Sequence, residues 1–486
     1  MSRLANSGIV ALERAESDRA VRGWLVPAII GSALLMQSLS ATVLFNALPV
    51  IAHALHEDPL RLNLAVTLYL LSSAVFLPVS GWAADKFGAR RILVLAMVLY
   101  ALSSAMCGFA TSLWALLSAR ILQGVASAMM VPVGRLVLLR TTPKDELVGA
   151  MSVLTMPALL GPVLGPVVGG AIVTFWDWRW IFFMNLPIAV IGVVLVLRHV
   201  PNVEEQGVPP LDWRGVILTG VGLAGLIFGF ENLGRDALPP AAVAALFIVG
   251  AVSLWLYGRH ARRTPNAVVD LSLFRLPTFN AAVMGGGFMR IALGASPFLL
   301  AMLFQIGFGL SPFRAGLLTF ISAAGGLVMK TVAPPILRRF GFRRVLIVNG
   351  FITSSLFVAY ALFQPSMPQW TIMLVLLAGG FFRSLQFTSL NGLSYADIDQ
   401  PRMSRASTMA SMSQQVVQSV GVGLAALLLH ATMQLRGETR ITVDAIAPAF
   451  VIIGLITFVS LAYYIRLPAN AGDEMNGRLL VTEADS

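Results

Sequence analysis

The sequence is poor in charge, in lysine and in cysteine. Charged residues make up 12% of its 486 residues, and only three of its 34 basic residues are lysine. Soluble domains carry about 25% charged and about 45–50% apolar residues, whereas this chain is 57% apolar and has a mean hydropathy of +0.81. The composition therefore excludes a water-soluble multidomain enzyme, a disordered chain and a collagen. Its single cysteine, Cys107, excludes an intramolecular disulfide.

The residue patterns of catalytic and metal sites are also missing. No cluster of His, Glu and Cys has metal-ligand spacing, and no glycine-rich phosphate loop is accompanied by the required Lys and Ser/Thr. We therefore expect no enzyme activity, no metal and no cofactor. Without a nucleotide site, any active transport would draw its energy from an ion or solute gradient.

Long apolar runs, separated by charged or polar residues, dominate the chain and predict an all-α polytopic membrane protein. The first run, which starts at Trp24, is too long for the apolar core of a cleavable signal peptide, so we expect a permanent helix there. The pattern predicts fourteen membrane-spanning helices: 24–51, 61–83, 92–111, 114–139, 146–174, 180–198, 213–231, 240–258, 278–304, 312–334, 345–363, 369–393, 404–430 and 446–465.

The basic residues are distributed unequally between the two sides of this topology. Of the 34, 23 lie on the side of the termini, six lie in the opposite loops, and five lie within helices. The positive-inside rule therefore predicts that both termini are cytoplasmic. It also accounts for most of the net charge of +11 without a nucleic-acid partner.

One eight-residue pattern occurs twice, 253 residues apart. FGARRILV at 87–94 returns as FGFRRVLI at 340–347, and each copy lies in a short loop on the side of the termini. Parallel repeats of this kind build one major class of secondary transporter, with the substrate site between the two halves. We therefore expect an N-terminal tail, a six-helix bundle, a linker with two additional helices, a second six-helix bundle and a C-terminal tail, at residues 1–23, 24–198, 199–277, 278–466 and 467–486.

The first copy of the repeat belongs to a longer loop motif, GWAADKFGARR at 81–91. Gly81 and Gly88 permit a tight turn, Asp85 can cap a helix, and Arg90 and Arg91 can anchor the loop at the anionic inner leaflet. Such a loop can also hold two bundles together in one conformational state through charge pairs. Anchoring of the topology alone is the alternative.

Two predicted helices contain unusual residues. Arg120 lies in the helix 114–139, where a cation normally faces a cavity or a partner. In the helix 146–174, glycines four residues apart allow close packing, and prolines bend the backbone. This second pattern predicts a hinge at Gly161, Pro162, Gly165, Pro166 and Gly169.

Together with WRWIFFMNLP at 178–187 and LSATVLFNALP at 39–49, these motifs resemble the major facilitator superfamily. The resemblance covers residues 24–466 and points to the fourteen-helix drug:proton antiporter branch (EmrB/QacA type) with its MdtD-like and HsrA-like exporters. It implies two six-helix bundles plus two extra central helices. It also implies a monomer in the bacterial inner membrane that exports small molecules by alternating access as an ion-coupled antiporter.

The sequence departs from this branch in one respect. The motif of the first helix usually carries an acid where this chain has Ser40, and no carboxylate lies at mid-membrane. The acids nearest to a membrane interior, Asp177 and Glu231, are at helix ends. Proton coupling commonly uses a buried acid whose pKa responds to desolvation and cargo. The coupling ion, a proton or another ion, is therefore left open.

Five cations lie within predicted helices instead: Arg120, Arg135, Arg290, Lys330 and Arg383. The resemblance implies that helices 24–51, 114–139, 278–304 and 369–393 line the cavity, and guanidinium groups pair well with carboxylate or phosphate. We therefore expect an anionic or zwitterionic cargo. The predicted contacts are Arg290, Arg383 and Arg120, with polar contacts from Gln37, Ser40, Asn46 and Gln386.

Several alternatives stay open at this point. Arg135 and Lys330 can reach the inner headgroups. Helix C-terminal dipoles and carbonyl groups can neutralise the arginines, in which case the cargo is neutral or a lipophilic cation. An uptake carrier of the same fold is also compatible with most of the motifs, except that of the helix 146–174.

Overall fold

The computed structural model describes residues 2–141, 147–200, 210–232, 238–264, 267, 269–398, 402–438 and 440–472. Within these ranges the description leaves out the side chains of residues 2–24, 139–141, 147–159 and 403–404, and of Arg135, Pro162 and Glu231. Every regular element in the described ranges is helical. The α-helices are α1 (Ser2–Ala54), α2 (Pro59–Leu62), α3 (Leu64–Phe87), α4 (Ala89–Gly108), α5 (Leu113–Thr141), α6 (Leu147–Phe175), α7 (Trp180–Phe183), α8 (Asn185–His199), α9 (Trp213–Glu231), α10 (Pro240–Ala261), α11 (Pro277–Asn280), α12 (Gly286–Ala301), α13 (Pro312–Ala359), α14 (Gln369–Leu393), α15 (Met403–Arg436) and α16 (Val443–Ile465). Short 3₁₀ and π segments lie between them: η1 (Leu271–Arg275), η2 (Ala281–Gly285), η3 (Met302–Gly307) and η4 (Tyr360–Leu362).

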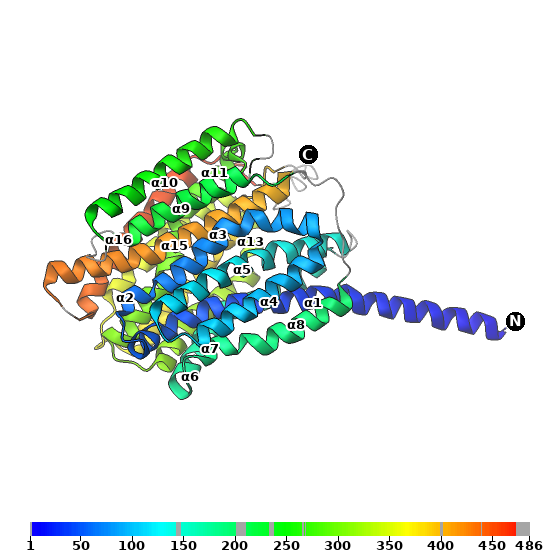
Figure 1. The fold of residues 1–486 in the computed structure, drawn as a ribbon, viewed down its shortest axis with the longest axis horizontal. Coiled ribbons are helices and arrows are strands. Elements are labelled where there is room, and N and C mark those ends of the chain that lie inside the picture. The colour runs from blue at the N-terminus through cyan, green and yellow to red at the C-terminus, as the bar shows by residue number, and fades with distance from the viewer. Residues whose placement is uncertain are drawn as a thin grey trace.

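Among the described residues, twelve helical stretches are long and apolar enough to cross a membrane. One of them, Pro312–Leu362, consists of two helices because Gly341 has a non-helical backbone. With α6, the stretches match the fourteen predicted helices. Helix α1 differs from its prediction, since it begins at Ser2 rather than Trp24 and its first turns project from the body (Figure 1). The segment before Trp24 is rich in Ala, Arg, Leu and Glu, which favour helix.

The sequence repeat corresponds to a structural repeat. Gly88 ends α3 with a φ of 91°, and Gly341 breaks α13 with a φ of 73°. A positive φ is readily adopted only by glycine, which explains why both copies of the repeat keep this residue. The same sharp turn therefore reverses the chain at equivalent places in the two halves.

Helix packing forms two groups and a hairpin (Figure 1). In the first group, α1 packs on α6 and α8, and α5 packs on α3 and α4. In the second, α13 packs on α14 and α16, and α12 packs on α15 and α16. The groups meet along two seams, α6 against α13 and α3 against α15. Helices α9 and α10 pack on each other, and α9 also contacts both α3 and α15.

The hydrophobic core changes along the length of the helices. We call the end that carries both termini proximal and the opposite end distal. In the distal half, one buried cluster joins both groups and includes Leu44, Leu62, Phe298 and Phe450. In the proximal half, one core contains Ile30 and Leu93 of the first group, and another contains Met329, Leu346 and Tyr464 of the second. A smaller cluster links the groups, since it joins Ala74 of α3 to Tyr257 of α10 and to Phe279 and Met412 of the second group.

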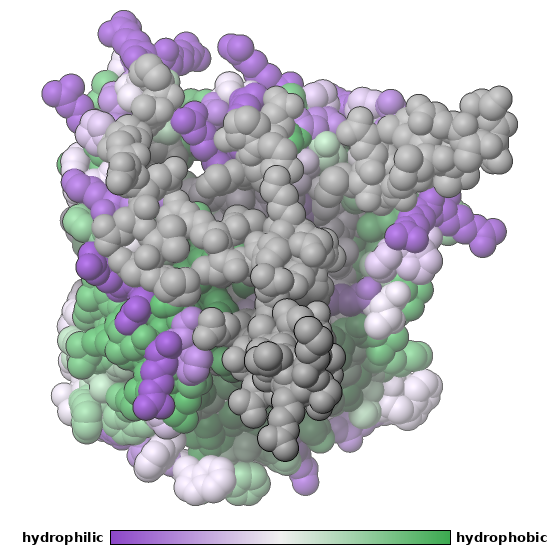
Figure 2. Space-filling view, turned by 90° about the vertical axis from the view of Figure 1, so that its right-hand side faces the viewer, coloured by the Kyte–Doolittle hydropathy of each residue, from purple (hydrophilic) through white to green (hydrophobic). Residues whose placement is uncertain are grey.

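The lateral surface suits a membrane. Large apolar side chains are exposed along the helices, and exposed tryptophans lie near both ends, Trp114 and Trp370 distally and Trp213 and Trp255 proximally. Tryptophan is typical of membrane–water interfaces. Seen from the proximal end, hydrophilic side chains gather along one rim and hydrophobic ones cover the opposite side (Figure 2). The chain is thus a multi-pass membrane protein.

Candidate functional site

Arg120 lies at the centre of a polar network inside the first helix group. Its side chain is 1% exposed, its Nε donates to the Ala65 carbonyl at 3.0 Å, and its Nη1 donates to Gln123. The guanidinium carbon is 4.3 Å from the centre of the Tyr69 ring, a cation–π contact. Carbonyl oxygens and a ring face therefore stabilise this cation inside the bundle, as the alternative interpretation of the arginines expects.

The network continues through Gln123 to α8. The Gln123 amide donates to the Ser104 hydroxyl at 3.2 Å, and the Asn185 amide donates to the same hydroxyl at 2.8 Å. The Asn185 amide also donates to Ser40 at 3.3 Å. Ser40 is 4% exposed and is therefore a buried helix-packing contact.

Gln37 joins the network from α1. Its amide donates to the Ser127 hydroxyl, which is also 2.8 Å from the Tyr69 hydroxyl. The structure thus brings three of the predicted residues, Gln37, Ser40 and Arg120, into one connected region. The connecting residues Tyr69 and Gln123 carry no separate signal in the sequence.

Arg290 is likewise buried, on α12 inside the second group. It is 4% exposed, donates to the Ala282 carbonyl at 2.8 Å, and donates to the Asn391 side chain at 3.2 Å. Ala282 lies in the π-helical segment η2, where the usual helical hydrogen-bond pattern is interrupted. A backbone carbonyl and a neutral amide therefore surround this second buried arginine.

Arg383 differs from the other two arginines. Its side chain is partly exposed, and its two terminal nitrogens each lie 3.3 Å from a serine hydroxyl, Ser296 on α12 and Ser322 on α13. Neither partner is charged or a backbone carbonyl. This guanidinium therefore keeps the most capacity to bind an anion among the three predicted arginines.

Helix packing explains the place of Arg383. In the second group, Gly380 lies three residues before Arg383 and approaches the Ser322 backbone on α13. In the first group, Gly124 lies three residues before Ser127 and approaches the Tyr69 backbone on α3 in the same way. Helices α3 and α13 carry the repeated glycine turns. Arg383 in the second half therefore occupies the position that is equivalent to Ser127 in the first half.

The remaining polar candidates lie elsewhere. Gln386 is 1% exposed and accepts a hydrogen bond from Asn349 at 2.8 Å inside the second group. Asn46 lies in the distal half, where its side-chain amide donates to the Pro166 carbonyl at 2.8 Å and its backbone carbonyl accepts from the Gln305 side chain at 3.0 Å. Gln386 lies one helical turn from Arg383 on α14, but its described hydrogen bonds, like those of Asn46, go to other partners. Lys330 is partly buried on α13, and the Arg135 side chain lies outside the described residues.

The glycine-rich motif forms the surface of α6 that faces α1. A Cβ atom at Gly161, Gly165 or Gly169 would lie within 3 Å of α1 atoms, from Ser38 to Val43. The Thr42 hydroxyl donates to the Gly161 carbonyl at 3.0 Å. Glycine is required here because the two backbones approach so closely.

Another face of α6 forms the distal seam with α13. A Cβ at Gly316 would lie 2.1 Å from the Pro166 carbonyl oxygen, and one at Gly170 would lie 2.4 Å from the Pro312 oxygen. The Phe313 backbone N–H donates to the Thr174 hydroxyl at 3.1 Å. The second seam has side-chain hydrogen bonds, from Gln415 to Ser73 at 2.9 Å and from Ser419 to the Thr67 carbonyl at 3.2 Å.

The loop motif lies at the proximal end, between α3 and α4. Gly88 is buried, Gly81 and Asp85 are partly buried, and Arg91 is exposed. Arg90 is partly buried. Lys86, within the motif, lies 4.8 Å from the centre of the Trp82 ring. The loop thus has the proximal position and the glycine turn that the sequence predicts.

Acidic groups are scarce near these sites. No aspartate or glutamate appears among the buried polar residues whose burial the structure describes, and no group of three metal-ligating side chains occurs among the described residues. The buried arginines therefore have no buried carboxylate partner within the described residues.

Comparison with known proteins agrees with this architecture. The model of the Major Facilitator Superfamily matches residues 30–422. The chain is 38% identical over 446 residues to "Putative multidrug resistance protein MdtD" of Escherichia coli O7:K1 (strain IAI39 / ExPEC), which covers 91% of this chain and 92% of the relative, and it matches the protein of the same name from Shigella flexneri to the same extent.

Solved transporter structures share the fold. The D-xylose-proton symporter superposes with a TM-score of 0.67 at 14% identity, over 93% of this chain and 98% of that one. A POT family transporter in complex with 5-aminolevulinic acid superposes with a TM-score of 0.62 at 14% identity, over 91% and 94%. The chain therefore belongs to the major facilitator superfamily of membrane transporters, and its resemblance to the MdtD multidrug resistance proteins is confirmed.

Proposed function

We propose that this transporter exports small organic anions or zwitterions across the bacterial cytoplasmic membrane, and that Arg383 binds the negative charge of the cargo. The observation that carries the proposal is the setting of Arg383. It is partly exposed, and its described hydrogen bonds go to the neutral hydroxyls of Ser296 and Ser322. A carboxylate or phosphate would bind such a guanidinium with two charge-assisted hydrogen bonds.

Arg120 and Arg290 have a different role in this proposal. Both are nearly inaccessible and donate to backbone carbonyls. They fix the packing of their helices and contribute positive potential to the interior, and the cargo contacts Arg383.

The change in core structure along the helices supports alternating access. A large distal core holds the two helix groups together, whereas each of the two main proximal cores belongs to one group and a smaller cluster around Ala74 links them. With the termini in the cytoplasm, as the basic residues predict, this state would receive cargo from the cytoplasm. Release on the other side would require the seams at Gly316 and Gln415 to separate and the proximal ends to meet. The glycine surface of α6, at Gly161, Gly165 and Gly169, would serve as the sliding contact.

Antiport with an ion is the energy source that fits a chain without a nucleotide site. No described buried carboxylate offers a proton site, so the coupling ion is a proton carried by another group or a different ion. Monomeric function is expected because each chain contains both halves.

The test uses the purified full chain in proteoliposomes, with counterflow of a panel of organic anions, zwitterions and cations. We expect Arg383→Ala to lower anion counterflow at least tenfold and Arg383→Lys to retain part of it. Arg262→Ala, which removes an exposed proximal cation, is the matched control and should leave counterflow unchanged. Anion counterflow that survives Arg383→Ala would refute the proposed cargo class.

A second candidate is a broad-specificity exporter of neutral compounds or lipophilic cations. The burial of Arg120 and Arg290 favours it, because only one of the three predicted arginines is left for the cargo. The same panel decides between the two: cation or neutral counterflow that is independent of Arg383 would favour this second candidate. Transport into inverted vesicles separates export from the uptake alternative.

A further inference from the structure

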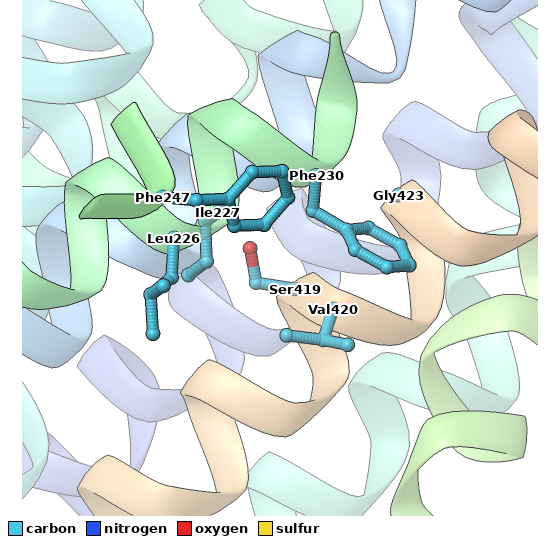
Figure 3. Close-up of a pocket in the computed structure, with 7 residues that line it drawn as sticks. All are labelled: Leu226, Ile227, Phe230, Phe247, Ser419, Val420 and Gly423. Carbon is cyan, nitrogen blue, oxygen red and sulfur yellow. The ribbon is translucent and has the colours of Figure 1, made fainter. Parts of the chain in front are cut away.

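A cavity of about 230 Å³ lies between the α9–α10 hairpin and α15 (Figure 3). Helix α9 contributes Ile227 and Phe230, α10 contributes Phe247, and α15 contributes Ser419, Val420 and Gly423. Figure 3 shows the two phenylalanine rings on the hairpin side and the α15 residues opposite them. None of the residues that line the cavity takes part in the described hydrogen bonds around Arg120, Arg290 or Arg383.

The lining cannot hold a polar ligand. Its one polar side chain is Ser419, whose hydroxyl donates to the Thr67 carbonyl on α3 at 3.2 Å. A cavity lined by Leu, Ile and Phe stays dry even at about 150 Å³ and binds small apolar molecules. The cavity therefore suits an apolar occupant.

The position of the cavity identifies the source of that occupant. The outer surface of the hairpin is strongly apolar and exposed, with Ile217 at 60% on α9 and Ile248 at 63% on α10. This surface faces hydrocarbon in a multi-pass membrane protein. The nearest apolar molecules are bilayer lipids, whose alkyl chains are long and thin enough to enter between helices.

We propose that this cavity binds the alkyl chain of a membrane lipid. The hairpin cannot close the cavity by compressing itself, because α9 and α10 are already in backbone contact: a Cβ at Gly225 would lie 2.8 Å from the Leu246 carbonyl oxygen, and one at Gly250 would lie 2.8 Å from the Leu226 nitrogen. An alkyl chain instead fills the space between this rigid pair and α15.

Occupancy would affect the seam between the two helix groups. Helix α9 contacts both α3 and α15, and Ser419 crosses that seam from the wall of the cavity. A bound alkyl chain thus lies beside a contact between the two helix groups, and that contact must change if the groups move. The inference depends on the membrane location of the chain and is independent of the cargo and the direction of transport.

The test uses the full chain in nanodiscs that contain phosphatidylcholine with a photoreactive diazirine on one acyl chain. After illumination, peptides are mapped by mass spectrometry. We expect crosslinks on buried lining residues, such as Ile227, at 4% exposure, in addition to crosslinks on the exposed surface. Gly423→Leu and Val420→Phe fill the cavity and should each lower lining crosslinks at least fivefold.

Val249→Phe adds the same bulk on the exposed face of α10 and should leave the lining crosslinks unchanged. Surface crosslinks and the thermal transition serve as internal measures of folding for every variant. Lining crosslinks that are absent from the wild type, or that persist in both filled variants, would overturn the proposal. Competition by a transported lipophilic compound, with no competition by unlabelled lipid, would assign the cavity to cargo and would also overturn it.

Discussion

The distal and proximal halves of the molecule are built from the same helices but are packed differently. Distally, one large hydrophobic core passes through both helix groups; proximally, each group has its own main core, and only a smaller cluster within the described residues, which includes Ala74 of α3 and Met412 of α15, links them. Helix propensity and composition do not differ enough to explain this, because each long helix contributes to both halves. The difference lies in which faces meet, and it teaches that the larger joint between the groups lies at one end.

The distal joint combines close backbone contact with few hydrogen bonds. Glycines at Gly170 and Gly316 bring α6 and α13 together, and Gln305 donates across the joint to the Asn46 carbonyl. A net hydrogen bond contributes only about 0.5–1.5 kcal/mol. Such a joint can be tight in one state and still separate in another.

The largest loss of folding stability is expected for a substitution inside the first helix group, at Arg120. Arg120→Ala removes the donor to the Ala65 carbonyl and the donor to the Gln123 side-chain oxygen, so we expect about 2–4 kcal/mol of destabilisation. Thermal unfolding in detergent measures it. Arg179→Ala, at an exposed distal ion pair, is the control, with an expected effect under about 1 kcal/mol. Equal transitions for the two variants would show that the polar network does not hold the first group together.

A smaller loss of stability is expected at the distal α6–α13 seam, where a substitution would directly weaken the contact between the two groups. Gly316→Ala places a methyl group against the Pro166 backbone and should destabilise the distal joint by about 1–3 kcal/mol. In a Cys107→Ser background, a Leu303→Cys reporter, buried at 2%, should then react about tenfold faster with a thiol reagent. Gly258→Ala has open space around its Cβ and should change nothing. Unchanged reactivity in Gly316→Ala would mean that this contact does not hold the joint.

Loss of one hydrogen bond across the joint should matter less. Gln305→Ala removes the donor to Asn46 and should weaken the joint by about 1 kcal/mol, which raises reactivity of the same reporter about fivefold. The exposed Gln434→Ala is the matched control. If both variants react alike, the joint depends on packing alone.

The smallest effect is expected at the proximal surface. Burial raises the pKa of Asp270, but hydrogen bonds from Ser272 and the nearby Arg402 lower it more, so that the pKa lies below its ordinary 3.8. A carboxyl group with a lowered pKa adds stability above its ordinary pKa, and this stability is lost as the pH falls through the lowered value. We expect Asp270→Asn to cost about 0.5 kcal/mol at neutral pH and nothing at strongly acidic pH. A cost that is independent of pH would contradict this assignment.

Much of the fold could be predicted from the sequence, because long apolar runs indicate membrane-spanning helices and the repeated glycines indicate tight turns. The fourteen helices follow from run length, and Gly88 and Gly341 follow from the repeat. The helical extension of α1 before Trp24 could not be predicted from an apolar run, since charged residues such as Arg14, Glu16 and Arg19 interrupt this segment.

The arginines show where sequence reasoning stops. A cation within a helix predicts a cavity or a partner, but no pattern says which. Arg120 pairs with a carbonyl 55 residues earlier, and Arg290 pairs with one exposed by a π-helical segment. The equivalence of Arg383 with Ser127 could have been found by aligning Gly124 with Gly380, since both glycines mark the same helix contact.

The central claim is that the distal joint must open during transport, and one crosslink tests it most directly. The Phe313 backbone N–H lies 3.1 Å from the Thr174 hydroxyl across the α6–α13 seam. A Thr174→Cys/Phe313→Cys double variant in the Cys107→Ser background should form a disulfide that stops counterflow when oxidised and restores it when reduced. Counterflow at the wild-type rate in the fully oxidised protein would contradict the account.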